Sequence, residues 1–199
     1  MKILFEYVLP VAIFIFGMWL AVKTDLLKDI QTGDNGPEKT FSFSRSQLFY
    51  WTMIVIICLC AGMGNNGNFD LLLKLKEPSI LLLLGISVGT ASVATYIDNE
   101  IPNPKKNTDS KGFIKDILSD AGGISVHRYQ ALLFNIIFGL VFVCQFITNT
   151  TEFPVFDNYA LALMGTSSAG YLLIKTNEKQ KKTVSDKSVI NVNTNTPVK

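Results

Sequence analysis

Long stretches without a charged side chain are the feature of this sequence that most limits its fold. Four of them contain no Asp, Glu, Lys or Arg, namely 46–64, 79–97, 129–148 and 158–174. A fifth, 3–22, contains only Glu6. A helix needs about 20 mostly apolar residues to cross the hydrocarbon core of a bilayer. Lipid offers no hydrogen-bond partners, and these runs lack the alternation of barrel strands, so we predict five transmembrane helices.

The composition agrees with a membrane protein. Hydrophobic residues make up 48% of the chain and charged residues only 17%, and the mean hydropathy is +0.31. No small-x-small cleavage site follows the first apolar run, and Glu6 and Pro10 interrupt it. We therefore expect a retained helix at 1–22 and not a cleaved signal peptide. The predicted fold class is an all-α integral membrane protein.

The distribution of positive charge predicts the orientation. Fifteen of the eighteen Lys and Arg residues lie in 23–45, 98–128 or the tail from 175. Lys and Arg resist translocation, so these segments are expected in the cytoplasm. With five crossings, the N-terminus is then outside and the C-terminus inside, in a bacterial inner (plasma) membrane.

Two similar helical hairpins follow the first helix. At the start of each hairpin, Phe41-Ser-Phe-Ser-Arg-Ser-Gln47 matches Ile124-Ser-Val-His-Arg-Tyr-Gln130, and each phrase has an aromatic residue four positions on. In the second helix of each hairpin, Leu84-Gly-Ile-Ser-Val-Gly-Thr90 matches Met164-Gly-Thr-Ser-Ser-Ala-Gly170. The repeats are predicted to be parallel, related by an axis near the membrane normal, with helix 1 outside them.

The expected organisation follows from the spans and the repeats. The segments are an N-terminal helix (1–22), a cytoplasmic loop (23–45), a first hairpin (46–97), a second loop with an amphipathic helix (98–127), a second hairpin (128–175) and a disordered cytoplasmic tail (176–199). The amphipathic helix is predicted at 112–120, where Phe113, Ile114, Ile117 and Leu118 share one face.

Polar residues gather where each hairpin begins, at what we expect to be the cytoplasmic mouth. This candidate cluster consists of Arg45, Gln47, His127, Arg128 and Gln130. One interpretation is a helix-start device, in which Arg snorkels to lipid phosphate and Gln satisfies free backbone groups. The other is a polar cluster that gates something at this face. We prefer the first.

The third and fifth apolar stretches are rich in small and hydroxyl residues. The candidates for packing or for lining a pore are Gly85, Ser87, Gly89, Thr90, Gly165, Ser167 and Ser168. Small residues four apart let helix backbones approach closely. Because no ionisable residue shares these turns, we prefer tight packing of the two helices at the pseudo-twofold axis over a polar pathway. Asn135 and Gln145 are expected to be hydrogen-bond partners between helices.

Catalytic and metal-binding patterns are missing from the sequence. Cys58, Cys60 and Cys144 all fall within apolar stretches, where we expect them to act as small apolar side chains. There is no P-loop, no Gly-x-Ser-x-Gly and no HExxH, and neither arginine is followed by a histidine at ribonuclease spacing. We predict a protein that is not an enzyme, without cofactor, metal or catalytic residues, and nucleic-acid binding is not expected.

Several phrases together resemble a family of uncharacterised bacterial inner-membrane proteins. They are 43–47, 85–90, Gly112-Phe-Ile-Lys-Asp-Ile-Leu-Ser-Asp120 and 126–130. The chain departs from the family pattern at 169–170, where Ala-Gly replaces Gly-Thr. In size, helix count and composition, the chain is also similar to the small transmembrane accessory proteins beside type VI-B CRISPR RNA-targeting nucleases.

The resemblance to the CRISPR accessory proteins implies a non-enzymatic, oligomeric membrane accessory or effector of antiviral defence. It would act through membrane permeability or by binding a cytoplasmic protein partner through 98–128 and the tail. The alternative is a small ion channel or carrier with a Ser/Thr-lined path through the third and fifth helices. Membrane lipid and further copies of the chain are the other expected partners.

Overall fold

The structure is a computed structural model that describes residues 3–29, 40–66, 71, 75, 78–100, 110–120 and 123–194. This part of the chain is helical apart from turns, one short strand pair and a single bridge between Lys28 and Phe41. The elements are η1 (Leu4–Val8), α1 (Leu9–Lys23), α2 (Phe43–Asn66), α4 (Pro78–Glu100), α5 (Phe113–Leu118), β1 (Ser119–Asp120), β2 (Gly123–Ile124), α6 (Val126–Thr148) and α7 (Asn158–Thr194).

Four helices in the described part are long and apolar enough to cross a membrane. They are Leu4–Lys23, Phe43–Gly64, Pro78–Ile97 and Val126–Thr148. The prediction of an all-helical protein with membrane-length apolar helices is confirmed for these four. The fifth stretch, 158–174, is helical as part of α7 but is not among them. Its Asn, Gly, Thr and Ser residues make it less apolar than the other four.

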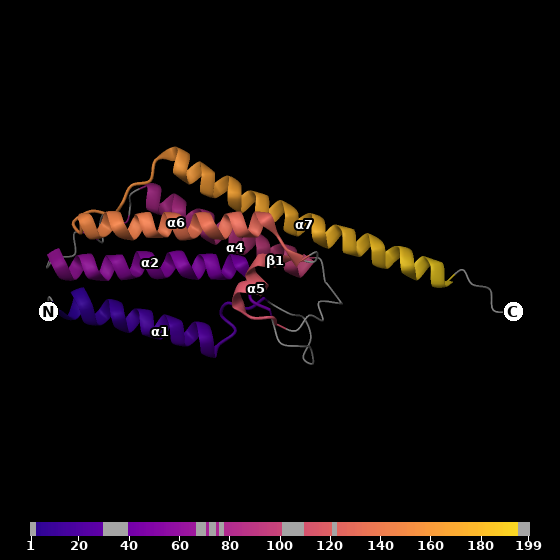
Figure 1. The fold of residues 1–199 in the computed structure, drawn as a ribbon, viewed down its shortest axis with the longest axis horizontal. Coiled ribbons are helices and arrows are strands. Elements are labelled where there is room, and N and C mark those ends of the chain that lie inside the picture. The colour runs from indigo at the N-terminus through magenta and orange to yellow at the C-terminus, as the bar shows by residue number, and fades with distance from the viewer. Residues whose placement is uncertain are drawn as a thin grey trace.

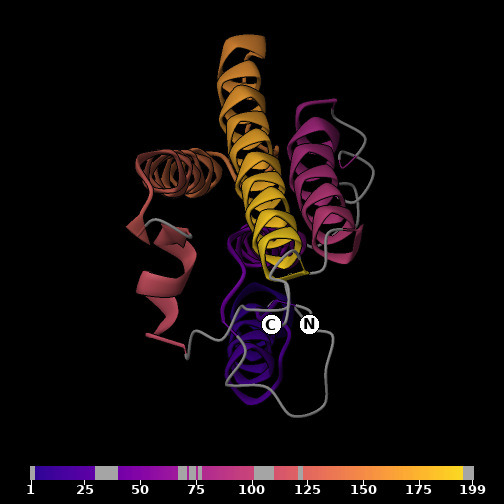
Figure 2. The same ribbon diagram turned by 90° about the vertical axis from the view of Figure 1, so that its right-hand side faces the viewer.

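Four helices form a bundle in which each packs against two others. α2 packs on α4 and α6, and α7 packs on the same two helices, while η1 and α1 pack along α2. Figure 1 shows that α2 and α6 run in one direction and α4 and α7 in the other. Figure 2 shows α1 below the bundle, outside the four. This is the arrangement expected of two parallel hairpin repeats with the first helix outside them.

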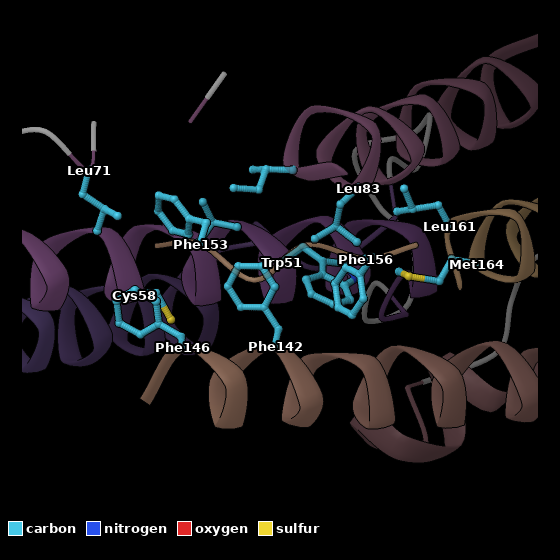
Figure 3. Packing of buried hydrophobic residues seen from close by; sticks show 12 residues of the cluster. Trp51, Cys58, Leu71, Leu83, Phe142, Phe146, Phe153, Phe156, Leu161 and Met164 are labelled. Carbon is cyan, nitrogen blue, oxygen red and sulfur yellow. The ribbon is translucent and has the colours of Figure 1, made fainter. Parts of the chain in front are cut away.

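Aromatic side chains fill the bundle from its middle, at Trp51, to the end where α2 and α6 finish. Trp51 and Phe142 are fully buried there, with ring centroids 6.3 Å apart. The connection between α6 and α7 folds back into the bundle and adds Phe153 and Phe156, whose centroids lie 6.3 and 6.0 Å from that of Phe142 (Figure 3). Aromatic pairs at these distances are favourable contacts in a close-packed core.

The opposite end, called the cap end, carries a small folded cap. Ser42 N–H donates to the Leu27 carbonyl at 2.7 Å, which ties the end of α1 to the start of α2. The Asp116 carboxylate accepts from Ser110 Oγ at 2.7 Å and from the Phe41 N–H at 3.3 Å. α5 therefore lies against the beginning of α2. It falls within 112–120, the segment where an amphipathic helix was predicted.

A strand pair that the sequence did not predict follows α5. β1 pairs antiparallel with β2, with Ser119 opposite Ile124 and Asp120 opposite Gly123. Gly123 has φ of 118°, a conformation that a side chain would strain. This short pairing turns the chain from α5 into α6.

The chain after 175 differs from the expectation of a disordered tail. α7 continues without a break to Thr194 and extends far beyond the other helices (Figure 1). No Gly or Pro occurs between Tyr171 and Thr194, and several residues there are Lys, Glu or Gln, which favour helix. The helix also continues directly from a packed segment, so it needs no new nucleus. Residues 195–199 lie outside the described part.

Candidate functional site

Buried polar side chains cross between the two repeats in the cap half of the bundle. Gln47 on α2 donates from Nε2 to Ser168 Oγ on α7 at 3.4 Å, and the two residues are only 4% and 5% exposed. Gln47 Oε1 has no hydrogen-bond partner among the described residues. A buried amide that is half satisfied still links two helices, because no water competes for the bond.

A second polar link joins α2 to α6. Trp51 is fully buried, and its indole Nε1 donates to Asn135 Oδ1 at 2.7 Å. Asn135 Nδ2 in turn donates to the Ala131 carbonyl of its own helix at 2.7 Å. The prediction of Asn135 as a hydrogen-bond partner between helices is confirmed. The side chain of Gln145 is exposed on the outside of the bundle.

Two hydroxyl groups of α4 bond within their own helix. Ser87 is 0% exposed and donates to the Leu83 carbonyl at 3.1 Å, and Thr90 donates to the Ile86 carbonyl at 2.7 Å. Ser87 therefore faces packed protein, and the aromatic cluster lies further along the same interior (Figure 3). For Ser87, Thr90 and Ser168, these surroundings support the packing interpretation.

The predicted glycine contact between α4 and α7 is not formed as expected. Gly85 and Gly89 lie on the exposed side of α4, and a Cβ added to either would meet nothing within 4 Å. Gly165 does face α4, with Ile86 at 3.9 Å from its added Cβ. Ser167 is half-buried beside it. The close-approach motif of α4 is therefore directed away from α7.

A one-residue difference in register explains this outcome. By burial, Trp51 of α2 corresponds to Asn135 of α6, and Ser87 of α4 corresponds to Ser168 of α7. The repeated motifs instead match Trp51 with Phe134 and Ser87 with Ser167, in each case one residue earlier in the second repeat. One residue corresponds to about 100° around a helix. Residues matched by motif consequently face different surroundings.

The five residues of the predicted mouth cluster do not form one site. The Arg128 guanidinium lies over the Tyr171 ring at 5.4 Å, and Lys175 lies near the same ring at 6.0 Å. Arg45 instead lines a groove between α2 and α4. Gln47 points into the bundle, whereas His127 and Gln130 are exposed. The two arginines therefore serve different faces of the molecule.

A groove beside Arg45 is a feature of this end that the sequence did not predict. Its volume is about 650 Å³, and it is open to one side of the bundle. The residues that line it are Leu26, Arg45, Leu48, Phe49, Thr52, Ala91, Ser92 and Thr95. Ser92 and Thr95 lie one turn apart on α4, and Thr52 lines the same groove from α2.

Reactive chemistry has little support within the described residues. Cys58, Cys60 and Cys144 are free thiols, of which Cys58 is buried and Cys144 exposed. Among the described residues, no group of three His, Cys, Asp or Glu side chains could hold a metal ion. Apart from Lys175, the buried polar residues described above are amides, hydroxyls and an indole, which can hydrogen-bond but do not titrate near neutral pH.

Comparison with known proteins found no match to a protein family, to a curated protein or to a solved structure. The resemblance to bacterial inner-membrane proteins therefore stays an expectation.

Proposed function

We propose that this chain is a non-enzymatic accessory protein of a bacterial inner membrane, which presents the end of α7 to a cytoplasmic protein partner. The length of α7 is the observation that carries the proposal. Its 37 residues correspond to about 55 Å, compared with about 30 Å for the hydrocarbon core. Roughly half of the helix extends beyond its apolar stretch, which ends at Ile174.

Packing supports α7 as a fifth membrane span. Its buried residues recur at helical spacing from Leu161 through Ser168 to Lys175, against α4 and α6. This interval corresponds to about 20 Å of helix beside two helices that can themselves span. A helix that hides small and hydroxyl residues between neighbours needs fewer apolar residues than one surrounded by lipid.

Charge supports a cytoplasmic location for the extension. The residues after Lys175 include Lys179, Lys181, Lys182 and Lys187. Basic residues within about 15–20 positions of a span oppose translocation. They also favour an acidic partner, because complementary charge speeds encounter and sets orientation. The accessory-protein resemblance makes an RNA-targeting nuclease the first partner to examine.

Oligomer formation is part of the proposal. Gly85 and Gly89 lie on one exposed face of α4, where a second helix could approach closely. Val88 and Tyr96 are also exposed on α4. We propose that copies of the chain associate in the membrane and so present several α7 extensions together, which would raise the effective affinity for a multivalent partner.

Photo-crosslinking in intact cells tests the docking role. A photoreactive residue at 184, within the extension, should crosslink one cytoplasmic protein. The same residue at 159, an exposed position at the opposite end of α7, serves as the control. Lys181→Glu together with Lys182→Glu should abolish the crosslink, while Lys115→Glu on α5 should leave it intact.

The outcomes separate docking from the antiviral role. Crosslinking that is equal at 159 and 184, or that ignores the charge reversal on α7, would contradict the docking proposal. A nuclease as the crosslinked protein would support the defence role. A biosynthetic enzyme would retain docking but reject antiviral defence.

A further inference from the structure

The groove between α2 and α4 has a polar mouth and an apolar interior. Arg45 stands near the start of α2 and Thr95 near the end of α4, so both lie at the cap end. Leu48 and Phe49 follow one turn deeper, above buried Ala91. Thr52 lines the groove two turns after Arg45, which corresponds to about 10 Å along the helix.

The second repeat offers an internal comparison for the groove. The burial registers that match Trp51 with Asn135 and Ser87 with Ser168 also give the counterparts, on α6 and α7, of all the lining residues except Leu26. For Arg45, Leu48, Phe49 and Thr52 the counterparts are Tyr129, Leu132, Leu133 and Ile136, and for Ala91, Ser92 and Thr95 they are Leu172, Leu173 and Thr176. The second repeat therefore has larger apolar residues where the first has Arg, Ala and two of its three hydroxyls.

This contrast is expected if a lipid binds to the first repeat but not to the second. Leu133, Ile136 and Leu173 are exposed on the outside of the bundle, as expected for residues that meet disordered acyl chains. The first repeat instead has a hollow with a cation at its mouth. Among the described residues, Arg45 takes part in no ion pair.

We infer that the α2–α4 groove binds one glycerophospholipid of the adjacent leaflet, with its phosphate at Arg45 and one acyl chain along Leu48 and Phe49. A guanidinium binds a phosphate through two parallel charge-assisted hydrogen bonds. Ser92 and Thr95 can donate to the ester carbonyls that lie just below the phosphate. The groove volume of about 650 Å³ falls within the usual range for ligand sites.

The lining favours a lipid over a free anion or a second copy of the chain. A free phosphate would leave the partly exposed Leu48 and Phe49 uncovered, whereas an acyl chain covers them. A helix from a second copy would need an anion to match Arg45, and acidic residues are absent from the long apolar stretches apart from Glu6.

Native mass spectrometry of the full chain in detergent, titrated with phosphatidylglycerol, tests this inference. One phosphatidylglycerol should remain on each chain at collision energies that strip all others. Arg45→Gln should weaken its binding roughly tenfold, as expected for loss of a hydrogen-bonded charge. Arg128→Gln removes the only other arginine and should have no effect, because that side chain lies over Tyr171.

Two further variants keep the test decisive if Arg45→Gln inserts poorly. Ala91→Leu places in the groove the residue of the corresponding α7 position and should also abolish retention. Val93→Leu on the exposed side of α4 is its matched control and should bind normally. Equal retention by Arg45→Gln and Arg128→Gln, or retention by Ala91→Leu, would overturn the inference.

The same spectra distinguish the rival occupants. Competition by glycerol phosphate at the concentrations where phosphatidylglycerol binds would assign the site to a free anion and overturn the lipid. A fall in oligomer mass with Ala91→Leu, without a change in bound lipid, would assign the groove to a second copy.

Discussion

Ser87 and Ser167 occupy matching motif positions but have different surroundings. Ser87 is fully buried between helices, whereas Ser167 is only half-buried on α7. The burial register pairs Ser87 with Ser168, which hydrogen-bonds to Gln47 across the bundle. The two serines matched by motif therefore do not lie along one continuous hydroxyl-lined path, because one of them is packed in the interior and the other is not.

Substitution by leucine at these two serines tests that distinction. Ser87→Leu forces extra volume into a close-packed position and should lower the free energy of unfolding by about 1–3 kcal/mol. Ser167→Leu should change it little. Thermal unfolding in detergent measures both variants. If instead both substitutions alter ion flux in liposomes while stability stays unchanged, a polar path along the serines would replace the packing account.

The residue scale also shows where sequence reasoning ends. Asn135 stands out as a polar residue in an apolar stretch, so its role as a hydrogen-bond partner was predictable. Its partner Trp51 was not, because the repeat makes Trp51 equivalent to Phe134 but does not say which residues contact each other. A motif can align two helices to within one residue, yet one residue is about 100° of rotation. That rotation decides which residues meet, and only three-dimensional packing fixes it.

At the scale of the element, α7 differs most from its prediction. Its second half is polar and basic, which is also typical of disordered tails. Its helix-favouring residues and the packed first half of α7 instead favour a helix that continues to Thr194. The tail composition alone could not decide between these, because nucleation by the preceding segment is a property of the assembled bundle.

Distance measurements between two spin labels test the α7 extension. Labels at 177 and 193, in a chain whose three native cysteines are replaced, should lie about 24 Å apart, from a helical rise of about 1.5 Å per residue. A continuous helix gives a narrow distribution around this distance. A flexible chain of that length has a similar mean but a broad distribution. A broad distribution in lipid nanodiscs would therefore contradict the helical extension.

Among the short elements, the sequence pattern predicted the helix α5 but not the strand pair β1–β2. The apolar spacing in 112–120 predicted the helix that becomes α5, because helical periodicity is a local signal. The β1–β2 pairing that follows involves only two residues on each side, too few for any alternating pattern. It lies between α5 and α6, and no local pattern in the sequence predicts it.

At the scale of the whole molecule, two hairpins form a bundle with α1 beside it. The five long apolar stretches and the repeated motifs predicted this layout, since length and periodicity are strong signals, and four of the five helices are apolar enough to span. The groove at Arg45 was not predictable. It depends on Ala91 and Thr95 of α4 facing Arg45 and Thr52 of α2, a juxtaposition that arises only once the helices pack.

Under the proposed function, α7 crosses the membrane as a fifth span and enters the cytoplasm. Labelling of single cysteines with an impermeant maleimide, in spheroplasts of cells that make an otherwise cysteine-free chain, tests this topology. Val155→Cys, in the exposed connection before α7, should react in intact spheroplasts. Lys187→Cys should react only after the membrane is permeabilised. Reaction of both cysteines on the same side would show that α7 does not cross, and it would contradict the account.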